Sequence, residues 1–306
     1  MNLKGFHHLT AVTADAPGNY KFYTQTLGLR LVKKTVNQDD TSAYHLFYAD
    51  GIGSPGTDIT FFDWPVGKEK RGTHSVTRTG FRVANEEALK FWQHRFTMLG
   101  VKQEKIVDQA GWQTLAFEDF EGQRLALVAD NAGEAHTWAE SPVPAEHQIR
   151  GLGPITMSVP DIRHTDKVLT NLMNMVPTGT FGGTHVYKMG AEGAVGELHV
   201  TVDPTLPQAQ QGAGAVHHLA FNIPYAEYDA WADRLRSMRV PNSGPVDRFW
   251  FKSLYFREPN GVLFELATDA PGFATDESME NLGKTLSLPP FLEGRREQIE
   301  AGLKKL

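Results

Sequence analysis

Two histidine pairs and one glutamate are the residues of this sequence best suited to bind a metal ion. One pair is His7 and His8, in Gly-Phe-His-His-Leu-Thr, and the other is His217 and His218. Glu265 lies in the apolar run Val-Leu-Phe-Glu-Leu-Ala, where an unpaired carboxylate would be costly to bury. Two imidazoles and one carboxylate leave several coordination positions open, as in non-haem Fe(II) sites that activate O2. We therefore predict a metal site formed by His8, His218 and Glu265.

A structural role is the commoner explanation for each of these residues taken alone. A single histidine on a strand is more often a partly buried core residue than a ligand, and a buried Arg or Lys could neutralise Glu265. Two histidines at equivalent positions of a repeated unit, together with a carboxylate, favour the metal site instead. His8 and His218 hold such positions, because each is the second histidine of a pair in a strand-like segment.

These segments belong to a structural unit that occurs four times along the chain. In the first unit, residues 6–13 alternate between the two faces of a strand, and Asp15 with Pro17 favours the start of a helix. Three further strand-like runs follow at residues 31–36, 44–48 and 58–62. The same order returns in units that begin near residues 81, 153 and 214. We predict an α+β fold made of four βαβββ modules.

The four units divide into two pairs joined by a linker. Residues 131–147 are rich in Ala, Glu and Pro and lack periodicity, which is typical of a linker. We expect an N-terminal domain at residues 1–145 and a C-terminal domain at residues 146–270. Residues 271–306 are expected to form a helical tail that acts as a cap or as an oligomer contact.

Alignment of the units limits which of them can bind the metal. Pro154 occupies the position of His8 in unit three, and unit two has no histidine there, so only units one and four supply one. Ala126 and His199 fall opposite Glu265 in the last strands of units two and three. The predicted site therefore requires unit one to lie beside unit four.

Composition narrows the classes of partner and location. The 306 residues include no cysteine, which excludes disulfides and thiolate ligands. No run approaches the roughly 18 apolar residues of a membrane span, so we expect no membrane partner and a cytoplasmic location. The net charge of −6, without a basic cluster, gives no support for nucleic-acid binding. A small molecule is the expected partner.

Four βαβββ units with chemistry on their first and last strands resemble the vicinal oxygen chelate superfamily, which includes glyoxalases and extradiol ring-cleaving dioxygenases. More narrowly, the motifs at residues 5–10, 44–50 and 247–261 are similar to those of hydroquinone-type ring-cleaving dioxygenases and of relatives assigned to quinone detoxification. The resemblance implies an Fe(II)-dependent dioxygenase that takes O2 and a hydroquinone or catechol, in quinone detoxification or aromatic degradation.

The resemblance also implies roles for residues around the metal. His217 is expected to be the acid/base residue, and Tyr255 and Arg248 are expected to orient or neutralise developing oxyanions. Seven residues apart on one regular strand, Tyr255 and Arg248 would face opposite sides, so we expect a bulge or a position of Arg248 before the strand. His7 and Thr10 are expected to contact the substrate.

Two other functions remain open at this point. The alternative metals to Fe(II) are Mn2+, Zn2+ and Ni2+. A glyoxalase-like isomerase would use Zn2+ or Ni2+ and would normally need a fourth protein ligand, for which His199 is the only candidate. A metal-free binding or resistance protein of the same fold would not bring His8 and Glu265 together.

Overall fold

The computed structural model describes all residues from 1 to 306 and shows an α+β fold of four modules. Module one contains β1 (Gly5–Thr13), α1 (Ala16–Lys21), β2 (Arg30–Val36), β3 (Tyr44–Ala49) and β4 (Asp58–Asp63). Module two contains β5 (Ser75–Val83), α2 (Glu86–Leu99), β6 (Val107–Gln109), β7 (Trp112–Glu118) and β8 (Arg124–Ala129).

The C-terminal half repeats this order. Module three contains β9 (Leu152–Val159), α3 (Ile162–Lys167), β10 (Val176–Phe181), β11 (Thr184–Lys188) and β12 (Glu197–Val202). Module four contains β13 (Val216–Ile223), α4 (Tyr228–Ser237), β14 (Val246–Asp247), β15 (Lys252–Arg257) and β16 (Leu263–Thr268). The predicted fold class and the predicted order of elements in each module are confirmed.

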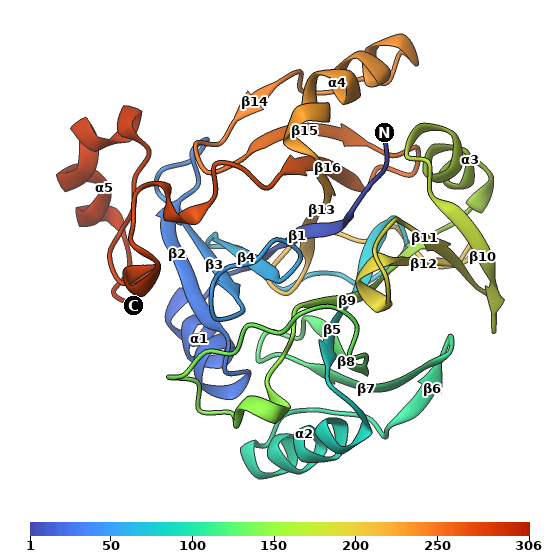
Figure 1. The fold of residues 1–306 in the computed structure, drawn as a ribbon, viewed down its shortest axis with the longest axis horizontal. Coiled ribbons are helices and arrows are strands. Elements are labelled where there is room, and N and C mark those ends of the chain that lie inside the picture. Colours follow the sequence, from blue (N-terminus) through green and yellow to red (C-terminus); the bar gives the residue numbers. More distant parts are fainter.

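The sixteen strands form two curved sheets of eight strands each (Figure 1). One sheet has the order β14-β15-β16-β13-β1-β4-β3-β2, and the other has the order β10-β11-β12-β9-β5-β8-β7-β6. Modules one and four thus share one sheet, joined by antiparallel pairing of β1 with β13. Each sheet takes one module from each half of the sequence, so the sheets do not follow the predicted division into residues 1–145 and 146–270.

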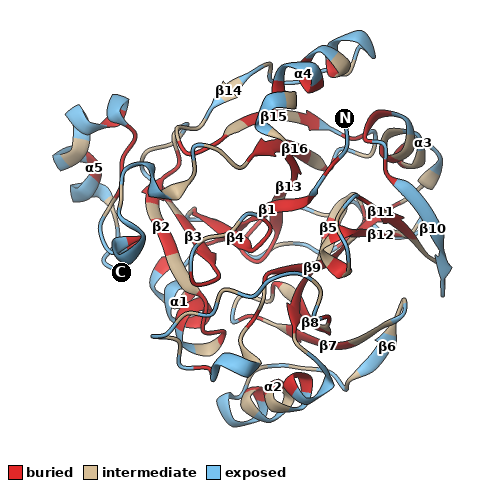
Figure 2. Cartoon of the chain, viewed as in Figure 1, coloured by how far each residue is buried: buried red, intermediate tan, exposed pale blue.

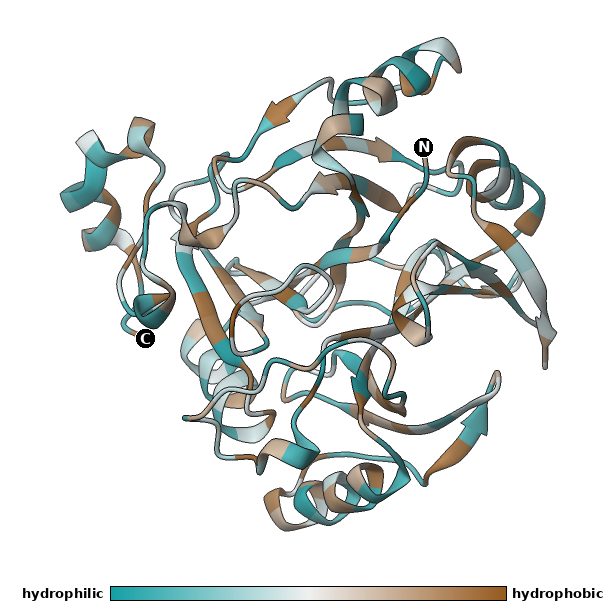
Figure 3. Cartoon of the chain, viewed as in Figure 1, coloured by the Kyte–Doolittle hydropathy of each residue, from teal (hydrophilic) through white to brown (hydrophobic).

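Local sequence signals explain where the helices begin and end. The Asn85 side chain accepts a hydrogen bond from the amide of Ala88 at the start of α2, and Gly100 ends this helix in the left-handed conformation. Asp15 caps α1 in the same way by accepting from the amide of Gly18. The helices α2, α4 and α5 (Arg296–Gly302) lie at the periphery and carry many hydrophilic residues (Figure 3).

The largest hydrophobic core joins the two sheets and the helices that cover them. It contains 52 buried residues, among them Leu9 and Leu219 of one sheet and Val76 and Ile155 of the other. The central strands are mostly buried, whereas β6, β10 and α5 are largely exposed (Figure 2). Residues on β1 and β13 are therefore held by packing on both sides, which suits a site that needs fixed geometry.

The tail after module four covers the outer edge of the first sheet. Its helical parts are short, Phe273–Thr275, Met279–Asn281, Pro290–Arg295 and α5. Leu288, Leu292 and Ile299 form a small core with Val36 of β2. The tail therefore caps this sheet edge, which is the first of the two roles expected for it. No helix combines the length and the apolar character that crossing a membrane would need.

Candidate metal centre

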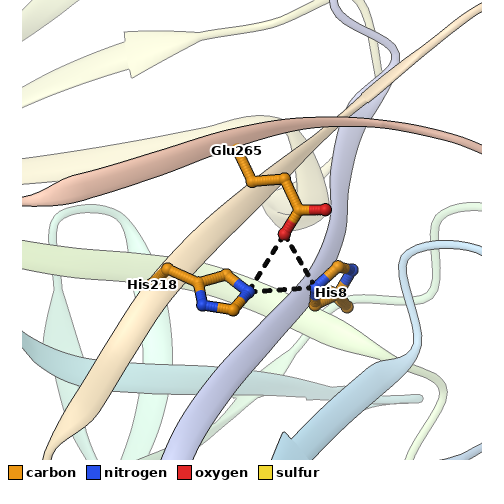
Figure 4. Close-up of side chains that lie close together, drawn as sticks. All are labelled: His8, His218 and Glu265. Atoms are coloured by element: carbon orange, nitrogen blue, oxygen red, sulfur yellow. Dashed lines mark hydrogen bonds and ion pairs between the residues drawn. The ribbon is translucent and has the colours of Figure 1, made fainter. Parts of the chain in front are cut away.

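The three predicted ligands meet on neighbouring strands of the first sheet. His8 lies on β1, His218 on β13 and Glu265 on β16, and all three are buried. Nε2 of His8 lies 3.2 Å from Oε2 of Glu265, and Nε2 of His218 lies 3.0 Å from the same oxygen. The two Nε2 atoms are 3.3 Å apart, and the side chains point toward one another (Figure 4).

The proton positions on His8 follow from its neighbour. Nε2 of His7 lies 3.1 Å from the carbonyl oxygen of Thr268, which can only accept, so His7 donates from Nε2. Burial first, and then the adjacent His8, lower the pKa of His7 to about 3, so this ring is neutral and its Nδ1 is an acceptor. Nδ1 of His8 lies 2.8 Å from that atom and must donate. In the neutral form that binds a metal, the single proton of His8 is therefore on Nδ1, and the lone pair of Nε2 is directed at Glu265.

The same contact occurs in the second histidine pair. Nδ1 of His217 lies 2.8 Å from Nδ1 of His218, and each pair of rings is set edge to face at 80°. Both His7 and His217 fall at register shifts between β1 and β13, and bulges of this kind re-aim side chains. This explains how adjacent strand residues, which normally face opposite sides, bring their rings together.

The convergence of acceptors favours a bound cation. When His8 is neutral, its Nε2 lone pair faces an ionised oxygen of Glu265 that has no hydrogen-bond partner of its own. Two buried acceptors this close repel each other unless a positive charge lies between them. Ligand atoms about 2.1 Å from one cation would lie about 3.0 to 3.4 Å apart, in agreement with the observed separations. The donor set and its spacing fit a metal ion.

Glu265 is held in the ionised form that metal binding requires. Burial alone would raise its pKa, but positive charge on the neighbouring rings of His8 and His218 outweighs burial and holds the pKa well below the ordinary value, and a metal ion bound by the neutral rings would supply the same positive charge. Oγ of Ser253 donates to the other carboxylate oxygen at 2.5 Å and orients the group. Oε2 is thus left free for the cation.

A cavity of about 400 Å³ opens onto His8 and His218. Its walls are largely aromatic and come from both modules of the sheet, with Phe47, Phe62, Trp64, Trp250 and Phe251 among them. His217 lines the same cavity and contacts the rings of Phe62 and Trp64. The space and its apolar walls suit a flat aromatic ring placed next to the metal.

Arg248 and Tyr255 meet at the edge of this cavity. Arg248 lies in the loop between β14 and β15, where Phe249 has a φ of 73°, so the two side chains are not on one regular strand. Nε of Arg248 donates to the Tyr255 hydroxyl oxygen at 3.2 Å, and its Nη2 lies 2.9 Å from Asp39. Burial raises the pKa of Tyr255 well above its ordinary value, so the phenol keeps a proton that it can donate.

The two predicted substrate-contacting residues lie one layer behind the cavity. His7 borders a separate cavity of about 190 Å³ next to Asp58 and Phe273. Thr10 is fully buried and bonds the hydroxyl of Thr60 at 2.8 Å. Both residues support side chains that face the main cavity, so the geometry favours an indirect role for them in place of the predicted contact.

His45 is a cavity residue that the sequence did not single out. It lies on β3, borders the main cavity, and packs against Phe47 and Phe62 with ring centroids 4.0 and 4.4 Å apart. Burial holds its pKa well below the ordinary histidine value. Only its place in the motif at residues 44–50 could have identified His45 as a cavity residue from the sequence. A histidine in a strand is usually structural, so this position alone was not enough.

No fourth protein ligand completes the centre. In the pairing of first and last strands, Thr60 holds in module one the place that Glu265 holds in module four, since Thr10 pairs with Thr60 and Ala220 with Glu265. A threonine there cannot supply a carboxylate. His199 lies on β12 of the other sheet and bonds a different carboxylate, so the structure does not support it as the ligand that an isomerase would need.

Comparisons with known proteins agree with this architecture. The family model described as the Glyoxalase/Bleomycin resistance protein/Dioxygenase superfamily matches residues 5–127 and 128–266. The chain is 45% identical to MhqA of Bacillus subtilis (strain 168), named as a candidate ring-cleaving dioxygenase, with all of both chains covered. It is 32% identical to the chlorohydroquinone/hydroquinone 1,2-dioxygenase of Sphingobium indicum, over 97% of this chain and 95% of that protein.

Solved structures of other proteins share the fold of this chain. A crystal structure of a candidate dioxygenase from Bacillus subtilis has a TM-score of 0.94 and 35% identity, covering 99% of this chain and 97% of that chain. Glyoxalase I from Zea mays shares the fold alone, with a TM-score of 0.64 and 15% identity, over 87% of this chain and 92% of that one. The chain therefore belongs to the glyoxalase/bleomycin resistance protein/dioxygenase superfamily, the vicinal oxygen chelate proteins.

Proposed function

We propose that this protein is a metal-dependent, ring-cleaving dioxygenase of the extradiol type that acts on a hydroquinone- or catechol-type aromatic compound. The observation that carries the proposal is the meeting of three metal-binding side chains, His8, His218 and Glu265, at an aromatic-walled cavity. The names of MhqA and of the Sphingobium indicum enzyme support the same reaction class.

Iron is the metal that fits this donor set best. Two imidazoles and one carboxylate with open positions form the ligand set of non-haem Fe(II) oxygenases, with Mn2+ as an alternative. A bound Fe(II) would supply adjacent positions for a phenolic oxygen and for O2, and so bring the two reactants together. Zn2+ or Ni2+ isomerase chemistry is disfavoured because Thr60 stands where a fourth ligand would be.

The protein side chains would bind the ring and control its protons. Aromatic walls would exclude water from the face of the substrate ring, which strengthens every polar contact in the cavity. Tyr255 would donate its phenolic hydrogen to an oxygen that gains negative charge, and the adjacent Arg248 guanidinium would stabilise that charge.

His217 acts as a hydrogen-bond donor in this proposal. When Nε2 of His218 is a ligand, its ring proton lies on Nδ1 and is donated to Nδ1 of His217. Neutral His217 then carries its own proton on Nε2, which has no protein partner and faces the cavity. The proposal therefore gives His217 the role of a hydrogen-bond donor in place of the expected acid/base role, because a neutral imidazole that lost its only proton would become an imidazolate.

Metal analysis followed by oxygen uptake tests the function. Protein loaded anaerobically with Fe(II) is expected to bind about one ion per chain, to consume O2 when hydroquinone is added, and to give a product that is heavier by two oxygen atoms. Glu265→Gln should lose both the metal and the uptake. Glu197→Gln is the matched control, because Glu197 is also buried and bonds a histidine but belongs to the other sheet.

Three outcomes separate the candidate functions. Iron binding with oxygen uptake supports the dioxygenase. Tight Zn2+ or Ni2+ binding without uptake supports the isomerase. The absence of stoichiometric metal binding contradicts the proposed site and leaves a binding protein of this fold.

We also propose that the substrate is a small aromatic molecule from quinone detoxification or aromatic degradation. The cavity volume and its apolar walls support this size and chemistry. A strain that lacks the protein should then be more sensitive to added hydroquinone, or should fail to grow on an aromatic carbon source. Unchanged behaviour in both assays would contradict this role.

A further inference from the structure

One ring nitrogen of His45 is held by the protein and the other is open to the main cavity. Nε2 lies 2.9 Å from the hydroxyl oxygen of Thr60. Nδ1 has no protein partner, yet it is not sealed from solvent in the way that the unpartnered Nδ1 of His74 is. Since His45 borders the metal-facing cavity, its Nδ1 is the atom that can meet a bound molecule.

The two threonine hydroxyls decide which nitrogen of His45 carries the proton. Thr10 is fully buried, and its hydroxyl contacts only the hydroxyl of Thr60, at 2.8 Å. If Thr60 donated to Thr10, the proton of Thr10 would be buried without an acceptor, which is unfavourable. Thr10 therefore donates to Thr60, and Thr60 donates its own proton to Nε2 of His45. All three groups are then satisfied.

This order of hydrogen bonds fixes the tautomer of His45. Burial, followed by the nearby His8, His218 and Arg248, outweighs the opposing charge of Glu265 and keeps the pKa of His45 well below its ordinary value, so the ring is neutral. A neutral imidazole that accepts at Nε2 must carry its single proton on Nδ1. His45 thus presents a hydrogen-bond donor to the cavity.

The position of His45 complements that of Tyr255. In the strand order β15-β16-β13-β1-β4-β3, the ligand-bearing strands lie in the middle, with Tyr255 on β15 at one side and His45 on β3 at the other. Both side chains border the same cavity. A ring that binds beside the metal would therefore meet a neutral donor on each flank.

We propose that His45 is a substrate-binding residue that donates its Nδ1 hydrogen to an oxygen substituent of the aromatic substrate, with Thr60 and Thr10 as positioning residues that set its tautomer. This inference rests on the proposed function, because it takes the ligand to be an oxygenated aromatic. A donor at this place favours hydroquinones and catechols over aromatic rings without oxygen.

The tautomer can be measured without any turnover. In 15N-histidine-labelled protein, prepared metal-free or with diamagnetic Zn2+, long-range 1H–15N spectra should show His45 protonated at Nδ1. Thr60→Val, which removes the hydroxyl but keeps the shape, should shift His45 toward the Nε2-protonated form. Thr60→Ser should keep the wild-type pattern. An Nε2-protonated His45 in the wild type would overturn the inference.

Anaerobic binding of hydroquinone tests the contact itself. Without O2 the Fe(II)-loaded protein cannot turn over, and Trp64 and Trp250 in the cavity wall give a fluorescence signal on binding. His45→Phe, which keeps a ring without a donor, should bind hydroquinone about 3- to 10-fold more weakly, the loss expected for one neutral hydrogen bond. His45→Asn keeps an N–H donor near the place of Nδ1 and should recover most of the affinity.

The outcomes distinguish failure of this inference from failure of the proposed function. Wild-type protein that does not bind hydroquinone overturns the proposed function, and the role of His45 with it. Wild-type binding that His45→Phe leaves unchanged overturns the role of His45 alone. The Fe(II) content of His45→Phe should match that of the wild type, and a loss of metal would show that His45 serves the metal site instead of the substrate.

Discussion

Nδ1 of His7 lies 2.8 Å from Nδ1 of His8, while Nε2 at the other edge of the His8 ring faces Glu265. His7 thus accepts a hydrogen bond from Nδ1 of His8. This bond keeps the ring proton of His8 on Nδ1, so that Nε2 is available to a metal. It is itself fixed by its bond to the carbonyl of Thr268. A chain of hydrogen bonds behind a ligand orients the ring and makes it a stronger donor to the metal.

The first prediction concerns this chain. His7→Phe removes the acceptor and should weaken metal affinity about 10- to 100-fold, the usual effect of losing such a partner. His7→Asn places an amide oxygen near the position of Nδ1 and should lose less. Competition with a chromophoric chelator measures both constants. Equal metal affinity in His7→Phe and the wild type, with weaker hydroquinone binding, would instead support the direct substrate contact that the sequence predicted.

The second prediction concerns the donor at the cavity edge. Tyr255→Phe keeps the ring but removes the hydroxyl, so in the proposed reaction a developing oxyanion would lose one donor. We expect kcat to fall about 10- to 100-fold, somewhat less than the loss of an oxyanion-hole donor in a protease, because Arg248 remains. Metal content should stay near the wild-type value, and anaerobic hydroquinone affinity should fall less than kcat. A lower affinity with unchanged kcat would show that Tyr255 acts in binding alone.

The third prediction concerns Asp119, which lies outside the candidate metal centre and should make the free energy of unfolding depend on pH. Burial raises the pKa of Asp119 to about 6, although the amides of Gln123 and Glu121 partly offset it. Between about pH 4 and 6 the folded protein binds more protons at this site than the unfolded chain does, so its contribution to stability falls as the pH rises. A shift of about two units corresponds to about 2 to 3 kcal/mol.

Asp119→Asn isolates this contribution. The free energy of unfolding of the wild type, minus that of the variant, should decrease by about 2 to 3 kcal/mol between pH 4 and pH 7. Urea denaturation at several pH values gives both curves. A difference that stays constant with pH would mean that the carboxyl group titrates alike in the folded and unfolded chains.

The sequence was sufficient to predict the parts of the site that depend on the repeat. His8 and His218 stand at equivalent positions of modules one and four, so the placement of module one beside module four could be inferred from them. Other features depend on contacts that no local pattern reveals. The bulges at His7 and His217 arise only where two distant strands pair. The approach of Arg248 to Tyr255 depends on the irregular loop before β15, and we expected a position before the strand only because the resemblance required the two residues to meet.

The burial of Lys33 is another feature that the local sequence could not predict. In the sequence it is one of two lysines in the strand-like run at residues 31–36, where alternation gives no reason to bury it. In the structure it is fully buried, because the tail places Asp276 at 2.8 Å and Glu277 beside its ammonium group. The partners are more than two hundred residues away along the chain, so only the fold discloses them.

The fourth prediction tests this buried cluster. Lys33→Met removes the cation and leaves two carboxylates without their partner, which should lower the free energy of unfolding by about 3 to 5 kcal/mol. Lys90→Met is the matched control, because its ion pair with Glu87 is exposed and its loss should change stability little. Urea denaturation measures both.

A triple variant decides whether unpaired charge is the cause. Lys33→Met combined with Asp276→Asn and Glu277→Gln replaces the two unpaired carboxylates by neutral amides. This variant should recover part of the lost stability. The cluster also reaches the cavity, since Asp276 accepts a hydrogen bond from Trp250 at 2.8 Å and the ammonium of Lys33 lies 5.0 Å from the centroid of that ring. Lys33→Met should therefore loosen Trp250 and weaken anaerobic hydroquinone binding, while the bound metal, held on β1, β13 and β16, stays in place. Metal loss in step with the weaker binding would mean that the tail supports the whole centre and not only the cavity wall.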